Sequence, residues 1–157
     1  MVTRDLHDSL ASHKFFTDLS SDHIDFLVSC AKNVIVEPGD FVFKEGSTAE
    51  SLYLVRDGNL AIEVSAPGPG ELVLATIGAG EMLGWSWLLP PHTHKTDCRA
   101  IEQTRLLALD AKCLRDKLAE DHALGYQVLG HVVETLARRL SSTRLQLLDL
   151  YSNNGHD

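Results

Sequence analysis

Short runs of β-branched and other apolar residues, separated by glycine-containing turns, constrain the fold of this chain more than any other feature. The runs are too short for helices and cover residues 34–36, 41–43, 52–55, 60–64, 72–77 and 106–109. Turn signals lie between them at Pro38-Gly39-Asp40, Glu45-Gly46-Ser47, Asp57-Gly58-Asn59, residues 67–70 and Gly78-Ala79-Gly80. Many short strands at this spacing are typical of antiparallel rolls and sandwiches. The sequence therefore predicts a mainly β fold, an antiparallel β-roll of the jelly-roll (double-stranded β-helix) type.

Helical patterns flank the predicted roll on both sides. Before it, Ser20 and Ser21 are N-cap candidates for a short helix whose apolar residues recur at helical spacing: Ile24, Leu27, Val28 and Ala31. After it, Asp110 is a candidate cap for a helix that carries Cys113, Leu114 and Leu118, and a longer helix follows from about 123 to 151. We therefore divide the chain into an N-terminal helical segment (1–32), the roll (33–110), C-terminal helices (111–151) and a frayed tail (152–157).

The long helix carries a second apolar pattern. Spacings of four and three residues, the a/d seam of a coiled coil, connect Leu129, Val133, Leu136, Leu140, Thr143, Leu147 and Leu150. A stripe over nearly 30 residues needs more surface than one end of a small roll offers, so we predict a homodimer through this helix. Alternatively the stripe covers the roll, and further apolar residues widen the face enough for both contacts: Val128, Val132, Leu145 and Leu148.

Composition narrows the function. The formal net charge of −8 argues against nucleic-acid binding by the whole surface. No apolar run approaches the roughly 20 residues that span a bilayer, and the first residues are polar, so we predict a cytoplasmic protein without membrane contact. The three cysteines, Cys30, Cys98 and Cys113, form no Cys-x-x-Cys pair, and we predict reduced thiols.

The ordered series of turns and strands resembles the cyclic-nucleotide-binding domain superfamily. The resemblance is carried by residues 36–46, 49–60, 78–84 and 99–100, and residues 136–143 look like the dimer helix of Crp/Fnr-type bacterial regulators. It implies a sensor domain rather than an enzyme, with a cyclic nucleotide or another small anionic ligand. In that class a DNA-binding domain follows the dimer helix. Only six residues without Lys or Arg follow Tyr151 here, so we predict no direct DNA binding and a protein partner instead.

The resemblance also places a phosphate-binding cassette at residues 80–100. In the family a short helix presents backbone N–H groups to the phosphate, a glutamate after a glycine holds the ribose, and an arginine some ten residues later pairs with the phosphate. Here Trp85 follows Gly84, and His94 stands at the arginine position. The candidate ligand residues are Gly84, Trp85, Ser86, Trp87, Leu88, His94, Lys95, Thr96 and Thr143. Thr143 matches the helix threonine that contacts the base, or else is a polar residue of the coiled-coil seam.

The replaced cassette residues predict weak or lost binding of cyclic AMP and cyclic GMP. Trp85 and Trp87 are expected to fill the space left by the missing glutamate and arginine. Alternatively, a remodelled pocket takes a different small anionic ligand. Two other functions stay open: a working cyclic-AMP regulator, and a metal-binding cupin-like enzyme suggested by His92-Thr93-His94. Against the enzyme, the glutamate that a cupin needs beyond the second histidine is replaced by Asp97 or Cys98.

Overall fold

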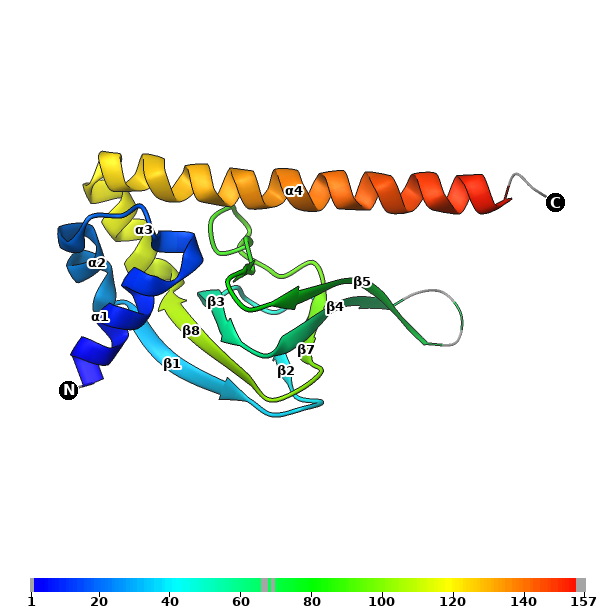
Figure 1. The fold of residues 1–157 in the computed structure, drawn as a ribbon, viewed down its shortest axis with the longest axis horizontal. Coiled ribbons are helices and arrows are strands. Elements are labelled where there is room, and N and C mark those ends of the chain that lie inside the picture. The colour runs from blue at the N-terminus through cyan, green and yellow to red at the C-terminus, as the bar shows by residue number, and fades with distance from the viewer. Residues whose placement is uncertain (1, 66–67, 69, 155–157) are drawn as a thin grey trace.

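Two antiparallel four-stranded sheets form a β-roll, flanked by helices (Figure 1). The computed structural model describes residues 2–65, 68 and 70–154. One sheet has the order β1-β8-β3-β6 and consists of Ala31–Val36, Thr104–Asp110, Ser51–Asp57 and Met82–Leu83. The other has the order β2-β7-β4-β5 and consists of Phe41–Phe43, Asp97–Ala100, Asn59–Ser65 and Glu71–Gly78. The predicted roll is confirmed; strands β6 and β7 were not predicted.

Strands β3 and β8 of the first sheet are buried on both faces over most of their length, which explains their almost continuous apolar runs. On β3, Leu52 and Leu54 belong to a core beneath the helices, whereas Val55 belongs to the core inside the roll. Leu107 and Leu106 on β8 divide in the same way. Because side chains alternate between faces along a strand, one run of apolar residues supplies both cores.

Gly58, between β3 and β4, is the turn glycine with the tightest surroundings. Its φ is +111°, and a Cβ built there would lie 2.6 Å from the Thr104 Cα. Gly39 also has a positive φ, +87°, but its Cβ would meet nothing within 4 Å. Substitutions at Gly39 and Gly58 therefore distinguish the cost of a positive φ from the added cost of a steric clash.

Gly58→Ala is expected to lower the free energy of unfolding by roughly 3 kcal/mol, because strain and a backbone clash act together. Gly39→Ala, the control, should cost only about 1 kcal/mol from the positive φ alone. Urea denaturation of both variants measures the difference. Equal losses would show that the approach to Thr104 relaxes freely.

The N-terminal helices cover one end of the roll, seen on the left of Figure 1. They are α1 (Val2–Ser12), a 3-10 turn (Lys14–Phe16) and α2 (Ser21–Val28). Ser20 caps α2, as predicted, with its hydroxyl accepting a hydrogen bond from the His23 N–H at 3.1 Å. The prediction that Ala31 continues this helix is wrong, because Ala31 pairs with Leu109 as the first residue of β1.

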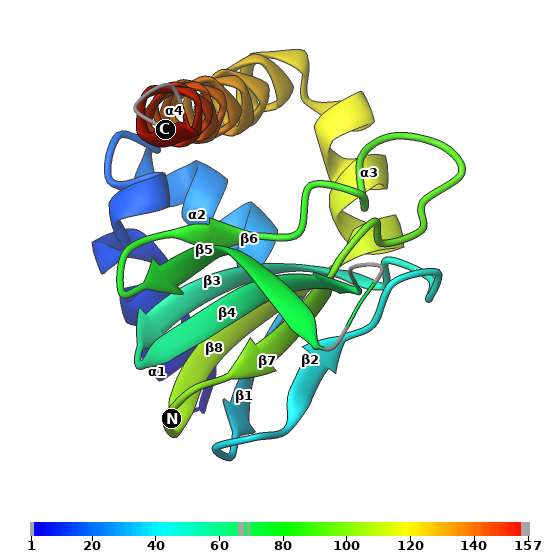
Figure 2. The ribbon, with the colours of Figure 1, turned by 90° about the vertical axis from the view of Figure 1, so that its right-hand side faces the viewer.

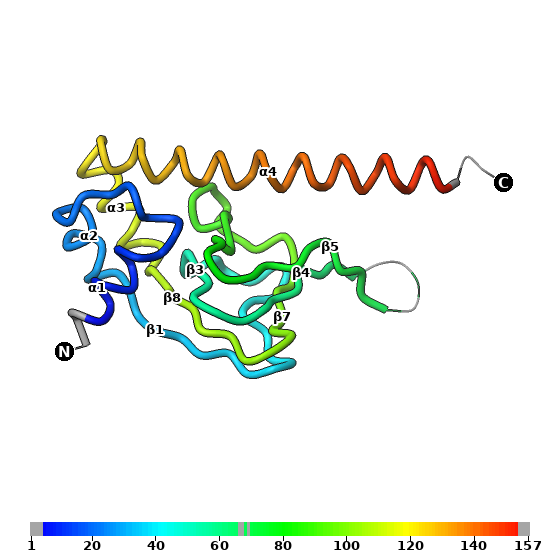
Figure 3. Tube along the Cα trace, viewed as in Figure 1, coloured from blue at the N-terminus to red at the C-terminus, as the bar shows by residue number. Residues whose placement is uncertain are grey.

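Two helices follow the roll. Helix α3 (Ala111–Glu120) is capped by Asp110, as predicted, and α4 covers His122–Asn154. The first part of α4 packs into the core through Leu124, Val128 and Val132. Its second part continues past the body of the roll (Figures 1 and 3). The helix thus includes three residues of the predicted frayed tail. Residues 155–157 of that tail, and part of the predicted turn at 67–70, lie outside the described residues.

In the part of the chain that is described, no helix is long and apolar enough to cross a membrane.

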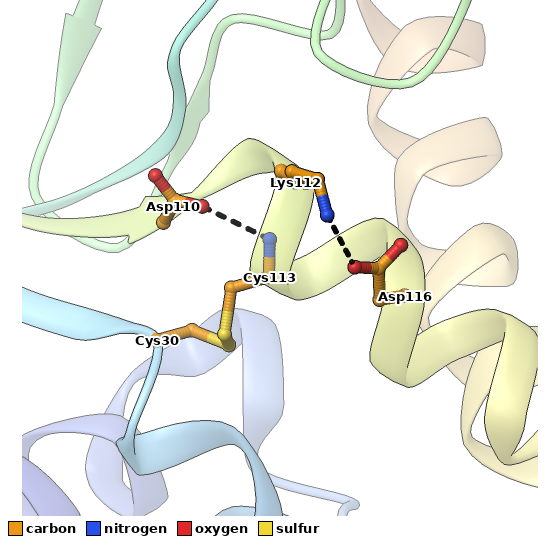
Figure 4. Close-up of a disulfide and its surroundings, with 5 residues drawn as sticks. All are labelled: Cys30, Asp110, Lys112, Cys113 and Asp116. Atoms are coloured by element: carbon orange, nitrogen blue, oxygen red, sulfur yellow. Dashed lines mark hydrogen bonds and ion pairs between the residues drawn. A yellow bond between two sulfur atoms is a disulfide. The ribbon is translucent and has the colours of Figure 1, made fainter.

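Cys30 and Cys113 form a disulfide, so the prediction of three reduced thiols is wrong (Figure 4). Cys30 follows the end of α2, and Cys113 lies in the first turn of α3, 83 residues later. Their Cα atoms are 5.7 Å apart, within the usual disulfide range. Sequence spacing could not reveal this pair, because only the packing of α2 against α3 brings the residues together. Cys98 is a free, buried cysteine.

Candidate functional site

A cavity of about 920 Å³ lies between the roll and α4. Viewed along α4, the helix lies over the side of the roll that carries β5 and β6 (Figure 2). The walls are side chains of β4 and β5, the segments 83–86 and 94–96, and α4 residues between 134 and 146. Both segments belong to the predicted cassette, so the structure brings the cassette and the long helix together around one space.

Most of the predicted ligand residues line this cavity. They are Gly84, Trp85, Ser86, His94, Lys95, Thr96 and Thr143. Trp87 and Leu88 instead pack in or against the core beneath the helices. Their predicted role as ligand contacts is not supported by this placement.

The short helix expected in the cassette is not present in the described residues. After β6, Gly84 takes a φ of +83° and the chain continues as turns. The Leu88 N–H donates to the Trp85 carbonyl and the His92 N–H to the Leu89 carbonyl, an i to i+3 pattern that does not propagate. Pro90 and Pro91 have no N–H to extend such a helix. A helix dipole therefore does not supply the attraction for an anion at this segment.

The two tryptophans point to different parts of the molecule. Trp85 is partly buried and lines the cavity, whereas Trp87 is fully buried in the core. The Trp87 carbonyl accepts a hydrogen bond from Arg115 Nη1 at 2.6 Å, and its indole Nε1 has no partner among the described residues. The prediction that both rings fill the pocket is therefore wrong, and the cavity stays open.

His94 does not replace the family's arginine as a cation. Its imidazole is only 3% exposed and stacks on the Phe43 ring, with centroids 3.6 Å apart and planes at 1°. Burial lowers the pKa of His94, so the ring is neutral at neutral pH. A Cβ at Gly84 would lie 3.5 Å from His94 Cε1, which makes His94 part of the packed floor of the cavity.

Arg139, on α4, is a functional candidate that was not among the predicted ligand residues. Arg139 lines the cavity, and its Nη2 donates a hydrogen bond to the Met82 carbonyl on β6. Nε is buried without a hydrogen-bond partner, and no carboxylate pairs with Arg139 among the described residues. Burial lowers the pKa of Arg139, although a guanidinium remains charged in proteins. In the sequence, Arg139 could have been identified as a candidate by its position one helical turn before Thr143. The Thr143 hydroxyl donates a hydrogen bond to the Arg139 carbonyl at 2.9 Å.

Of the other charged residues around the cavity, Lys95, Glu134 and Arg138 are exposed and Glu81 is partly buried. Lys95 and Arg138 lie at its edge, and Glu81 and Glu134 supply carboxylates. Glu81 Oε2 accepts a hydrogen bond from the Gly78 N–H at 2.7 Å. Arg99, the other cation near the cassette, pairs with the buried Glu63 at 2.6 Å. Arg139 is therefore the half-buried cation of the cavity without an ion-pair partner in the described structure.

The predicted dimer seam is mostly exposed in the single chain. Its uncovered members are Leu129, Val133, Leu140, Leu147 and Leu150. Leu136 differs, because it packs against the core and borders the cavity. The stripe thus does not cover the roll along its whole length, and its second half has no partner within the described chain.

The His-x-His pair at residues 92 and 94 is not part of a metal-binding group. No three His, Cys, Asp or Glu side chains are placed to hold a metal ion in the described parts of the chain. His94 is stacked on Phe43 instead.

Comparisons with known proteins agree with this architecture. The family model of the cyclic nucleotide-binding domain matches residues 33–121 of this chain. The chain is 28% identical over 145 residues, 92% of its length, to the CRP-like cAMP-activated global transcriptional regulator of Mycobacterium tuberculosis. It is 32% identical over 137 residues, 87% of its length, to the cyclic AMP receptor protein of Thermus thermophilus. It spans 63% and 61% of these two relatives.

A solved structure has the same fold. The cyclic nucleotide-binding domain of Methylobacillus flagellatus superposes with a TM-score of 0.78 at 22% identity, over 94% of this chain and 83% of that one. The family model covers more than half of the chain and includes the roll except the first two residues of β1. The chain therefore belongs to the cyclic nucleotide-binding domain family.

Proposed function

We propose that this chain is a non-catalytic sensor domain of the Crp/Fnr type whose cavity binds a small anionic ligand and whose α4 passes on the bound state. The observation that carries the proposal is Arg139, a half-buried guanidinium in the cavity whose Nε lacks a partner among the described residues. A half-buried cation without an ion-pair partner is costly even with the Glu81 carboxylate nearby, and an anionic ligand would reduce that cost.

The same cavity is expected to bind cyclic AMP and cyclic GMP weakly. The residue after Gly84 is Trp85, which offers no carboxylate to a ribose hydroxyl, and His94 is buried and neutral. A hydrogen bond to a charged group contributes about 1.5 to 3 kcal/mol, so losing two such contacts turns a micromolar site into one of roughly millimolar affinity. Arg139 offsets part of this loss from the opposite wall.

Helix α4 is suited to transmit the bound state because it forms one wall of the cavity and also carries the exposed seam. Arg139 joins the helix to β6 through the Met82 carbonyl, and Leu140 follows it on the seam. A ligand that pairs with Arg139 would change the position of the helix relative to the roll. In the proposed homodimer, this movement of α4 would directly change the interface between the two copies.

The wider setting is also a proposal. Because the relatives are named as a transcriptional regulator and a cyclic AMP receptor protein, we place this domain in the cytoplasm. The net charge of −8 disfavours direct DNA contact by this domain, so the output is expected to pass through a protein partner.

Titration with cyclic AMP, followed by NMR at the two tryptophan indole N–H signals, tests the ligand site. We expect the Trp85 signal to move and the Trp87 signal to stay, with a dissociation constant of roughly 1 mM. Arg139→Gln should weaken binding by about tenfold or more, because it removes a charged hydrogen-bond donor from the cavity. The neighbouring Arg138→Gln is the control, with a change of about twofold, since Arg138 is exposed.

Two outcomes would contradict the proposal. A low-micromolar constant for wild-type protein would mean that the replaced cassette residues do not weaken nucleotide binding. Equal affinities of wild type and Arg139→Gln would remove Arg139 as the anion partner.

A further inference from the structure

We propose that the Cys30–Cys113 disulfide is a reversible thiol–disulfide switch that controls the conformation of the cavity segment 84–91 through α3. The inference concerns regulation of the proposed ligand site, and it rests on the proposed function only for the consequence to binding. The coupling itself is a property of the chain and is measurable without any ligand.

Helix α3 connects the disulfide to the cavity within one helical turn. Cys113 is tied to Cys30, and two residues later Arg115 Nη1 donates to the Trp87 carbonyl at 2.6 Å. Trp87 lies only two residues after Trp85, which lines the cavity. A movement of the first turn of α3 therefore reaches the wall of the cavity through a single hydrogen bond.

Few other bonds hold this segment from outside. The Trp85–Leu88 and Leu89–His92 backbone bonds are internal to it. Arg115 holds the backbone of Trp87, whereas the Trp87 ring is held by packing in the core, and hydrogen bonds to charged groups are stronger than neutral ones. The Trp87 indole is buried, and its Nε1 has no partner in the described structure, so no hydrogen bond of its own fixes the ring in addition to core packing.

The positions of the three cysteines favour thiol–disulfide exchange at Cys30 and Cys113 over exchange at Cys98. Cys113 is partly exposed and lies beside Cys30, which is buried; Cys98 is also buried, and burial raises its pKa to about 12, so its thiol stays protonated and unreactive. In a reducing compartment disulfides are usually transient and regulatory rather than permanent. Oxidation is thus expected to join Cys30 to Cys113 and to spare Cys98.

The reaction balances with a small-molecule disulfide, such as oxidised glutathione, as the oxidant. One cysteine thiolate attacks a sulfur of that disulfide, its S–S bond breaks, and one small thiolate leaves and takes up a proton. The second cysteine thiolate then attacks the mixed disulfide and expels the other small thiolate. Two protein thiols lose two electrons and two protons in total, and the small disulfide is reduced to two thiols.

Fluorescence quenching of Trp87 tests the coupling. The chain has two tryptophans, so Trp85→Phe leaves Trp87 as the single fluorophore. In this background we expect reduction by a phosphine to raise the acrylamide quenching constant by about fivefold, the low end of usual coupling between sites. Adding Cys113→Ser should give the reduced value under all conditions, and adding Cys98→Ser should preserve the full redox response.

Arg115→Gln in the same background separates transmission through α3 from direct effects of the disulfide on the indole. It should still form the disulfide by thiol counting, yet show the same quenching oxidised and reduced. A redox response of the Trp87 quenching that survives in Arg115→Gln would overturn the proposed path. Arg115→Lys, a second substitution at the same position, checks that the result does not depend on one substitution. Unchanged Trp87 quenching in the folded Trp85→Phe protein, or three free thiols after oxidation, would overturn the switch. Because no ligand is added, these outcomes are distinct from failure of cyclic-AMP binding.

Discussion

Reducing the Cys30–Cys113 disulfide should lower the free energy of unfolding by about 4.5 kcal/mol at 25 °C, because the bond closes a long loop in the unfolded chain. The two residues are 83 positions apart, so the whole roll lies inside that loop. For a chain of this size the melting temperature is then expected to fall by roughly 10 °C or more. Urea denaturation with and without a phosphine reductant measures the effect.

The matched controls are two serine variants. Cys113→Ser should unfold like reduced wild type whether or not reductant is present. Cys98→Ser removes the free cysteine, and its response to reductant should equal that of wild type. A loss of less than about 1 kcal/mol on reduction would mean that the reduced, unfolded chain retains structure joining these two regions.

Leu140→Asp should convert a homodimer of this chain into a monomer. The Leu140 side chain is 52% exposed in the single chain and lies near the middle of the seam on α4. A coiled-coil dimer would bury it in both copies, and aspartate would bring two uncompensated charges into that interface. We expect the dimer to weaken by about 100-fold or more, equivalent to some 3 kcal/mol.

Leu145→Asp is the control for this experiment. Leu145 is also exposed on α4, but the helical repeat places it away from the seam, so it should leave the dimer nearly unchanged. Sedimentation velocity at tens of micromolar protein distinguishes the species. A monomeric wild type at that concentration would reject the seam, as would equal effects of the two substitutions.

Local signals in the sequence were sufficient for the architecture. The glycine turns, with the strands between them, predicted the roll, and Gly58 needs both its positive φ and its missing Cβ. Ser20 and Asp110 cap the helices that their positions predicted. These features involve neighbours within a few residues, which is why the amino-acid order alone reveals them.

Strands β6 and β7 were missed for a different reason. Met82–Leu83 is too short to show a pattern, and Asp97–Ala100 contains two charged residues. Each becomes a strand because it pairs with a strand already in place, Tyr53 with Leu83 and Ile62 with Cys98. Strand formation here follows from partners distant in sequence, which outweigh local propensity.

By itself, then, the sequence determined the roll, its flanking helices and the apolar stripe of α4, and it led to the prediction that Trp85 and His94 replace two charged ligand residues. Only the tertiary structure decided that Trp87 leaves the pocket for the core, that Arg139 enters it from α4, and that Cys30 meets Cys113. The physical reason is one of range. Turns, caps and periodicity act between residues close along the chain, whereas a cavity, a buried cation and a disulfide depend on how separate elements pack.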